Sequence, residues 1–238
     1  MKKVIILKVG STFPSLRTSH GDFEDWIAAP LTDYREVLEV WDPRITPSLP
    51  DIDSMKGMII SGSHSMVTDR LGWSERLAGW LPAVVARGIP LLGICYGHQL
   101  LAHAMGGTVA DNPNGREFGT CKICFTPEAA DDPLLGCFTP SITANLCHTQ
   151  SVIRLPAGAM RLARSNRDPN QAFRIGNSAW GVQFHPEFDM VAMRAYVREC
   201  TKLLSGEGQE PAELERNVTD TPAGGKLLQG FVKLALGE

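Results

Sequence analysis

The sequence predicts an α/β fold, with a doubly wound, mainly parallel central sheet, helices on both of its faces and a short antiparallel extension. Short apolar runs alternate with segments of helical periodicity through the first half of the chain, which is typical of βαβ units. Residues 89–95 (IPLLGIC) are almost continuously apolar, as in a central strand buried on both faces. With 238 residues, 43% of them hydrophobic, the chain can bury one large core or two small ones.

The first half of the chain supplies the expected parallel units. Strands are expected over residues 2–10, 35–41, 55–63 and 89–95, and helices over residues 73–88 and 96–107. A long polar loop is expected between the first two strands. Gly88 is a helix stop signal and Pro82 favours a kink within that helix, whereas the glycine pair at 106–107 suits a C-cap.

The second half changes to short strands and turns. From Thr108 to Leu155 this pattern predicts an antiparallel extension of the sheet, and strand character continues through residues 159–165, 171–176 and 179–188. A strongly amphipathic helix is expected over 189–204, a polar break over 205–213 and a terminal helix over 224–238. We expect one domain over residues 1–200, with a helical extension over residues 201–238 packed on it.

Composition excludes several classes of partner. The net charge is −3 and the basic residues are scattered, so the chain has no electrostatic footprint for nucleic acid or for an anionic membrane. The apolar run near the N-terminus is broken by Lys8, which makes it too short for a secretory signal, and no apolar stretch is long enough for a membrane span. We expect a cytoplasmic protein.

Six cysteines raise the question of disulfides or a metal site. Thiols stay reduced in the cytosol, and a chain of this length needs no staples. Cys121 and Cys124 have the spacing of half a zinc site, but they lie in a strand-like segment, where residues three apart point to opposite faces. Neither a dinucleotide-binding glycine motif nor a P-loop occurs in the sequence. We expect neither a metal ion nor a cofactor.

Cys95 stands where the buried strand ends and a helix begins. Gly93 and Gly97 flank it in a G-x-Cys-x-G pattern, which is typical of a nucleophile elbow because small residues relieve crowding at the strained turn. A thiol at a helix N-terminus is favoured as thiolate, and the free backbone N–H groups there can receive an oxyanion. The alternative is a small inert hydrophobe in the core.

A thiol nucleophile needs a base, and His185 has the best setting among the six histidines. It follows an apolar strand at the end where α/β sheets gather their active sites. Glu187, two residues later, is placed to fix the tautomer of the imidazole and stabilise the imidazolium. The other five histidines have weaker settings. His20 and His64 lie in loops and His148 ends a short strand, whereas His98 and His103 are expected on the helix after Cys95, facing away from it.

With these residues the sequence closely resembles the class I (triad) glutamine amidotransferases. The resemblance rests on GICYGHQLLA around Cys95 and on WGVQFHPEF around His185, with supporting similarity between them over roughly residues 50–190. MIISGSHSMVTD occupies the position of the family's oxyanion loop. The overall pattern looks most like stand-alone relatives of the GMP synthetase amidotransferase domain, and it implies a flavodoxin-like sheet.

The resemblance implies a specific chemistry. Cys95 attacks the γ-amide carbon of glutamine, His185 protonates the departing ammonia and then activates water, and Glu187 orients His185. Backbone N–H groups of Tyr96 and of the loop at Gly62 and Ser63 hold the oxyanion. Glutamine binding maps onto Gln99, Thr149 and Gln150, the last two by position alone. The ammonia would pass to a separate acceptor enzyme, such as a synthetase subunit.

One departure from the family and two alternatives remain. The family's oxyanion loop usually has Ser-Gly-Gly-Pro, whereas this chain has Ser61-Gly62-Ser63-His64, so a conformation that glycine adopts easily would be strained at Ser63. A γ-glutamyl peptidase or hydrolase could use the same triad, and the absence of an ATP-binding motif from the sequence favours it. A non-catalytic partner subunit is the third hypothesis, and the complete triad disfavours it.

Overall fold

The computed structural model describes residues 2–238 and contains a nine-stranded sheet. One half of this sheet is parallel and ends next to the predicted nucleophile. Across the sheet its strands run in the order β2 (Leu38–Trp41), β1 (Lys3–Leu7), β3 (Met55–Ile60), β4 (Leu91–Ile94) and β11 (Ala179–Val182). All four residues of β4 are buried, as expected of a strand with covered faces.

The other half of the sheet is antiparallel. It continues the order with β10 (Ala172–Ile175), β9 (Met160–Arg164), β6 (Glu117–Phe125) and β7 (Ser141–His148). A separate two-stranded sheet pairs β5 (Thr108–Asp111) with β8 (Gln150–Arg154). The predicted α/β class is confirmed, and the antiparallel extension is longer than the sequence indicated.

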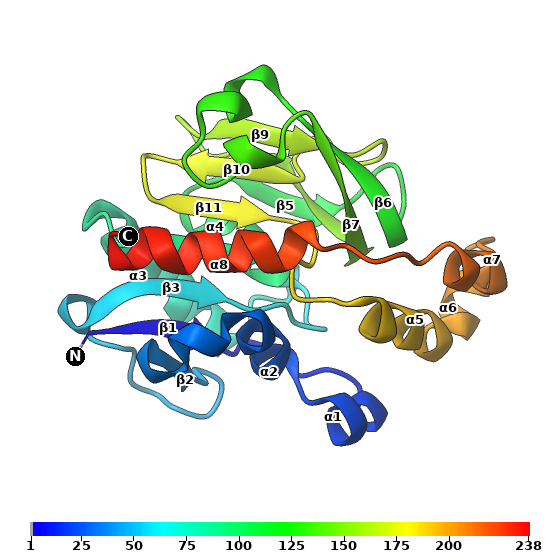
Figure 1. Ribbon diagram of the computed structural model, residues 1–238, viewed down its shortest axis with the longest axis horizontal. Coiled ribbons are helices and arrows are strands. Elements are labelled where there is room, and N and C mark those ends of the chain that lie inside the picture. The colour runs from blue at the N-terminus through cyan, green and yellow to red at the C-terminus, as the bar shows by residue number, and fades with distance from the viewer. Residues whose placement is uncertain (1) are drawn as a thin grey trace.

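Helices cover both faces of the sheet. The helices of the chain are α1 (Pro14–His20), α2 (Phe23–Ala28), α3 (Gly72–Ala86), α4 (Tyr96–Ala104), α5 (Met190–Glu199), α6 (Thr201–Gly206), α7 (Pro211–Arg216) and α8 (Ala223–Leu236), of which α1, α5, α6 and α7 lie beyond one end of the strands in Figure 1. Short 3-10 helices span Ala29–Val37, Ile52–Ser54, Val67–Asp69, Pro127–Asp131 and Gly136–Phe138. In Figure 1, α8 crosses in front of the sheet, and α3 and α4 lie behind it.

The apolar side chains of β1 show how the two faces are filled. Val4 and Ile6 belong to the core that includes the buried residues of α8, whereas Ile5 and Leu7 belong to the core beneath α3 and α4. This alternation follows from the two-residue period of a strand. Both faces are therefore dry, which holds the strands rigid where they carry the site.

Two segments differ from the sequence-based expectation. The expected polar loop before β2 contains α1, α2 and a 3-10 helix, because Asp22 and Asp25 form a reciprocal capping box that starts α2. The expected helix over residues 189–204 is divided at Cys200 into α5 and α6, and α7 begins at Pro211 within the expected polar break. The terminal helix is present as α8. No helix within residues 2–238 is both long enough and apolar enough to cross a membrane.

Gly97 is required where α4 meets β3. A Cβ at this position would lie 2.6 Å from the carbonyl oxygen of Ile60. We expect Gly97→Ala to destabilise the protein by about 1–3 kcal/mol, because the clash is with backbone. Gly79→Ala in α3 is the matched control, since nothing lies within 4 Å of its Cβ position. It should stabilise by about 0.5–1 kcal/mol. Denaturant unfolding measures both, and equal effects would contradict the argument.

Candidate active site

Cys95 occupies a strained turn between β4 and α4. Its backbone has φ 48° and ψ −95°, and it is the N-cap residue of α4. Its N–H donates to the carbonyl oxygen of Val182 at 2.9 Å, which ties the turn to β11. A Cβ at Gly93 would lie 2.4 Å from the carbonyl oxygen of Gly97, so the strand and the helix can approach this closely only with glycine. This is the geometry expected of a nucleophile elbow.

His185 lies in the loop that follows β11. Its backbone N–H donates to the carbonyl oxygen of Asn145 at 2.9 Å, which joins this loop to β7. Its Nδ1 lies 2.8 Å from Oε1 of Glu187 and must donate, because a carboxylate only accepts. The side chains of His185 and Glu187 are 4% and 0% exposed. Glu187 therefore fixes the tautomer of the imidazole and leaves Nε2 for the thiol.

The neighbours of His185 set its protonation state. Burial alone would lower the pKa of His185, but the carboxylate of Glu187 and the sulfur of Cys95 beside the ring raise it to about 10. At neutral pH the ring is therefore an imidazolium. An imidazolium at this position is a proton donor beside Cys95.

The loop at Gly62 faces the same point. An ideal Cβ on Gly62 would lie 3.1 Å from Cε1 of His185 and 3.9 Å from Cβ of Cys95, so a side chain there would press on the ring. Within residues 2–238, the non-glycine residues with positive φ are Arg70 and Cys95. Ser63 thus carries no left-handed strain, and that concern from the sequence was wrong.

A pocket of about 420 Å³ opens over Cys95. Its lining includes five of the six residues that the sequence assigned to oxyanion or glutamine binding: Ser63, Tyr96, Gln99, Thr149 and Gln150. The sixth, Gly62, is not part of the lining. The rest of the lining comes from the residue before α1, the loop after β3, the start of β6, the end of β7 and the α5–α6 segment: Phe13, His64, Ser65, Met66, Arg116, Phe118, Cys147, His148, Tyr196, Glu199, Cys200 and Leu203.

One end of this pocket is rich in hydrogen-bond acceptors. Nε2 of Gln99 donates to the carbonyl oxygen of Gln150 at 2.8 Å, which fixes the orientation of its amide and leaves Oε1 as the free atom. The amide of Gln150 donates to Asp111 and Thr68, so its Oε1 is also free. This Oε1 and Oγ1 of Thr149 are buried without a partner. Such an end suits a ligand that carries several N–H donors.

His64, which the sequence placed near the site either as a substrate contact or as a loop residue without a role, lines the pocket. Its Nε2 lies 3.1 Å from the hydroxyl of Tyr196, which also contacts Oγ1 of Thr12 at 2.9 Å. Burial and the charge of His185 lower the pKa of His64, so it is neutral beside the imidazolium. The sequence offered no signal for Tyr196, which is one apolar-face residue of an amphipathic helix.

The remaining histidines lie away from Cys95, as expected. His98 is fully buried against Phe173 with its ring 4.7 Å from the phenyl ring, and burial lowers its pKa to about 3. His103 contacts Arg70 and Glu75 on the exposed side of α4. His148 is the exception, because it reaches the pocket from the end of β7.

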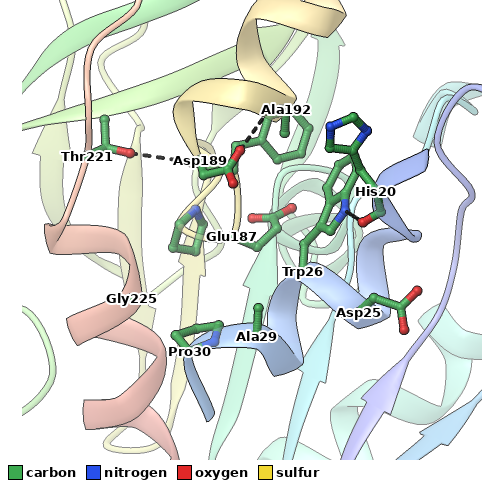
Figure 2. Close-up of a pocket in the computed structure, with 12 residues that line it drawn as sticks. His20, Asp25, Trp26, Ala29, Pro30, Glu187, Asp189, Ala192, Thr221 and Gly225 are labelled. Carbon is green, nitrogen blue, oxygen red and sulfur yellow. Dashed lines mark hydrogen bonds between the residues drawn. The ribbon is translucent and has the colours of Figure 1, made fainter. Parts of the chain in front are cut away.

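A second pocket, of about 400 Å³, lies on the other side of the HPEF turn (Figure 2). Trp26, Ala29 and Pro30 form one wall, and Thr221, just before α8, and Gly225, in its first turn, form another. Glu187 lies between these walls, but its side chain is fully covered. The carboxylate end of the hydrogen bond between His185 and Glu187 is thus shielded from water.

The cysteines and the carboxylates give little support for a metal site. All six cysteines are free, and Cys121 and Cys124 lie three residues apart on β6. Within the described part of the chain, the one group of three candidate metal-binding side chains is Glu117, His148 and Asp168. Glu117 and His148 already pair with each other at 3.1 Å.

Comparison with known proteins decides the family. The family model for class-I glutamine amidotransferases matches residues 22–201. The chain belongs to this family. The match includes both motifs of the predicted triad and ends at the start of α6.

Relatives of two kinds are similar to this amidotransferase. The GMP synthase (glutamine-hydrolysing) of Porphyromonas gingivalis is 34% identical over 206 residues, which is 86% of this chain and 35% of that protein. The chain therefore spans about a third of the length of such synthases. Gamma-glutamyl peptidase 4 of Arabidopsis thaliana is 28% identical over 200 residues, covering 79% of this chain and 77% of that protein.

Solved structures agree on the fold. A glutamine amidotransferase from Thermotoga maritima has a TM-score of 0.79 at 18% identity, with both chains covered completely. A glutamine amidotransferase from Methylobacillus flagellatus has a TM-score of 0.75 at 24% identity and covers 100% of this chain and 95% of its own.

Proposed function

We propose that this amidotransferase hydrolyses the γ-amide of L-glutamine to glutamate and ammonia. The observation that carries the proposal is the buried hydrogen bond between His185 and Glu187 beside Cys95, which lines a pocket that also contains hydrogen-bond acceptors. Free acceptors on Gln99, Thr149 and Gln150 suit the ammonium group of an α-amino acid.

The proposed reaction has two halves. The Cys95 thiolate attacks the γ-carbonyl carbon, and the oxyanion accepts backbone N–H bonds from Tyr96 and from the loop at Gly62 and Ser63. The His185 imidazolium gives its proton to the departing ammonia, which leaves a γ-glutamyl thioester on Cys95. The neutral ring then takes a proton from water, the hydroxide attacks the thioester, and glutamate departs as the thiol is restored.

The destination of the ammonia is also part of the proposal. The GMP synthases carry about two thirds of their length outside the region matched by this chain. We propose that a separate synthetase receives the ammonia. A reducing compartment such as the cytoplasm suits the chemistry, since Cys95 must stay a free thiol and two more thiols, Cys147 and Cys200, line its pocket.

A second candidate is a γ-glutamyl peptidase, and the size of the pocket favours it. Beyond the acceptor-rich end, the pocket continues along apolar side chains that include Phe13, Phe118 and Leu203. Departing ammonia needs no such wall, whereas the amine part of a γ-glutamyl compound would be held by it. The similarity to a plant γ-glutamyl peptidase of comparable length points the same way.

Steady-state kinetics with glutamine and with γ-glutamyl dipeptides tests the two candidates. A higher kcat/KM for glutamine, measured as ammonia release, supports the amidotransferase. A higher kcat/KM for a γ-glutamyl dipeptide supports the peptidase and contradicts the amidotransferase. Labelling of Cys95 by an alkylating glutamine analogue covers the case in which turnover needs an absent partner. Absence of both turnover and labelling would contradict both candidates.

A further inference from the structure

A second histidine–carboxylate pair lies at the edge of the pocket, outside the catalytic triad, with His148 in the pocket lining. Nε2 of His148 is 3.1 Å from Oε2 of Glu117, and these two residues face each other across the antiparallel pair β6 and β7. Their side chains are 1% and 4% exposed. Burial alone would raise the pKa of Glu117, but hydrogen bonds from His148, Ser165 and Gln171 hold it below its ordinary value. Glu117 is therefore a buried carboxylate.

The partners of the ring define its protonation. Nδ1 of His148 lies 2.9 Å from the carbonyl oxygen of Gln150, and Nε2 faces the carboxylate of Glu117. Both oxygens only accept, so both ring nitrogens donate and the ring carries two protons. The amide of Gln171 also lies 3.4 Å from Nε2, but it donates to Glu117 at the shorter distance of 2.8 Å.

Two other titratable groups face this pair. Burial raises the pKa of Asp168, which lies in the loop between β9 and β10, and this favours its neutral form. Burial lowers the pKa of His98 on α4 to about 3, so that ring is neutral. The carboxylate of Glu117 is thus the counter-charge of the His148 imidazolium.

The His148 imidazolium is hydrogen-bonded to a residue of the proposed glutamine-binding part of the pocket. The carbonyl oxygen of Gln150 accepts from Nδ1 of His148 and from Nε2 of Gln99, which in turn donates to Oε1 of Gln183 at 3.0 Å. The backbone carbonyl of Gln150 therefore joins the end of β8 to α4, the helix that begins after Cys95. The free side-chain acceptor of Gln150 lies at the same end of β8. A hydrogen bond from a charged donor is about twice as strong as a neutral one.

We propose that the buried Glu117–His148 ion pair positions the Thr149–Gln150 edge and Gln99 for recognition of the α-amino acid end of the substrate. This inference rests on the proposed function. Glu117 and His148 are positioning residues, since they act through Gln150 and Gln99 rather than on the reacting atoms. Loss of the pair should weaken substrate binding and leave the chemistry at Cys95 intact.

Glu117→Gln tests the pair because it removes the charge and preserves the shape. The glutamine amide would face Nε2, so His148 becomes neutral and its bond to Gln150 loses the charge assistance. We expect KM for glutamine to rise about tenfold with kcat within about threefold of wild type. Labelling of Cys95 by the alkylating glutamine analogue should slow to a similar extent, whereas alkylation by iodoacetamide should keep its rate. A parallel fall of kcat and both labelling rates would indicate general damage and overturn the proposal.

Asp168→Asn is the matched control, because it changes a carboxyl group of the same buried cluster whose pKa is raised by burial, which favours the uncharged form that asparagine mimics. It should leave KM and kcat close to wild type, and an effect equal to that of Glu117→Gln would overturn the proposal. Nitrogen-15 NMR of histidine-labelled protein gives a readout independent of activity, with His148→Asn to assign the signal. Two protonated nitrogens at neutral pH in wild type and one in Glu117→Gln support the ion pair, and one protonated nitrogen in wild type overturns it.

These outcomes are separable from those of the proposed function. A wild-type protein that hydrolyses neither glutamine nor a γ-glutamyl compound contradicts the proposed function, while NMR and labelling still decide the ion pair. A wild-type protein that hydrolyses glutamine with a KM unchanged by Glu117→Gln overturns the inference alone.

Discussion

Cys95→Ala should remove glutamine hydrolysis while the protein stays folded. Loss of the nucleophile of a catalytic triad costs about 10⁶-fold in kcat in well-studied hydrolases. A reduction of at least about 10⁴-fold is expected here, because the thioester pathway depends on Sγ. Ammonia release under saturating glutamine measures it. The analogue label should also disappear, although the other pocket thiols, Cys147 and Cys200, remain.

The same position should show a conflict between activity and stability. Cys95 adopts a positive φ in a turn held by Val182, and L-residues are strained in this region. Cys95→Gly should relieve the strain and be about 1–2 kcal/mol more stable than Cys95→Ala in denaturant unfolding. Both variants should be inactive. A Cys95→Gly protein that is less stable than Cys95→Ala would show that the turn is not strained.

The site was predictable where chemistry and local pattern coincide. The G-x-Cys-x-G pattern after an apolar run implies a turn that only small neighbours permit, and the contact between Gly93 and Gly97 is the physical reason. The interval between His185 and Glu187 is local too, so one loop can hold both. The antiparallel strands could be predicted as strands, but their order depends on contacts between distant residues.

Other features depend on contacts that no local pattern encodes. Glu117 and His148 stand 31 residues apart and meet because β6 pairs with β7 in one register. The helices before β2 were hidden by polar composition, although the capping box at Asp22 was a usable signal. The apparent strain at Ser63 came from assuming that this chain keeps the family's loop geometry, and the loop adopts ordinary backbone angles instead.

Glu187→Gln should lower kcat by about 10²–10⁴-fold and change its dependence on pH. The carboxylate of Glu187 fixes the proton on Nδ1 of His185 and contributes to the raised pKa of about 10. The wild-type rate should therefore hold through neutral pH and fall only as pH rises through about 10, when the proton donor for ammonia is lost. Without the carboxylate, the pKa of His185 moves down toward its ordinary value of 6.5, so the alkaline fall should begin at lower pH. Initial rates measured from about pH 6 to about pH 10.5 show where the alkaline fall begins in each protein, because this range spans both the ordinary and the raised pKa of His185.

Stability should follow the same shift with a defined sign. A group whose folded pKa is raised stabilises the native state below its unfolded pKa, and this stabilisation is lost as pH rises through the folded pKa. Wild type should therefore lose stability between pH 6.5 and about 10, and Glu187→Gln should show a flatter profile in that interval. Glu75→Gln is the matched control, since Glu75 pairs with His103 at 3.2 Å on the exposed side of α4, away from the pocket. It should retain the wild-type rate and alkaline limb. An alkaline limb that stays near 10 in Glu187→Gln would mean that the charge of Glu187 does not hold the proton on His185.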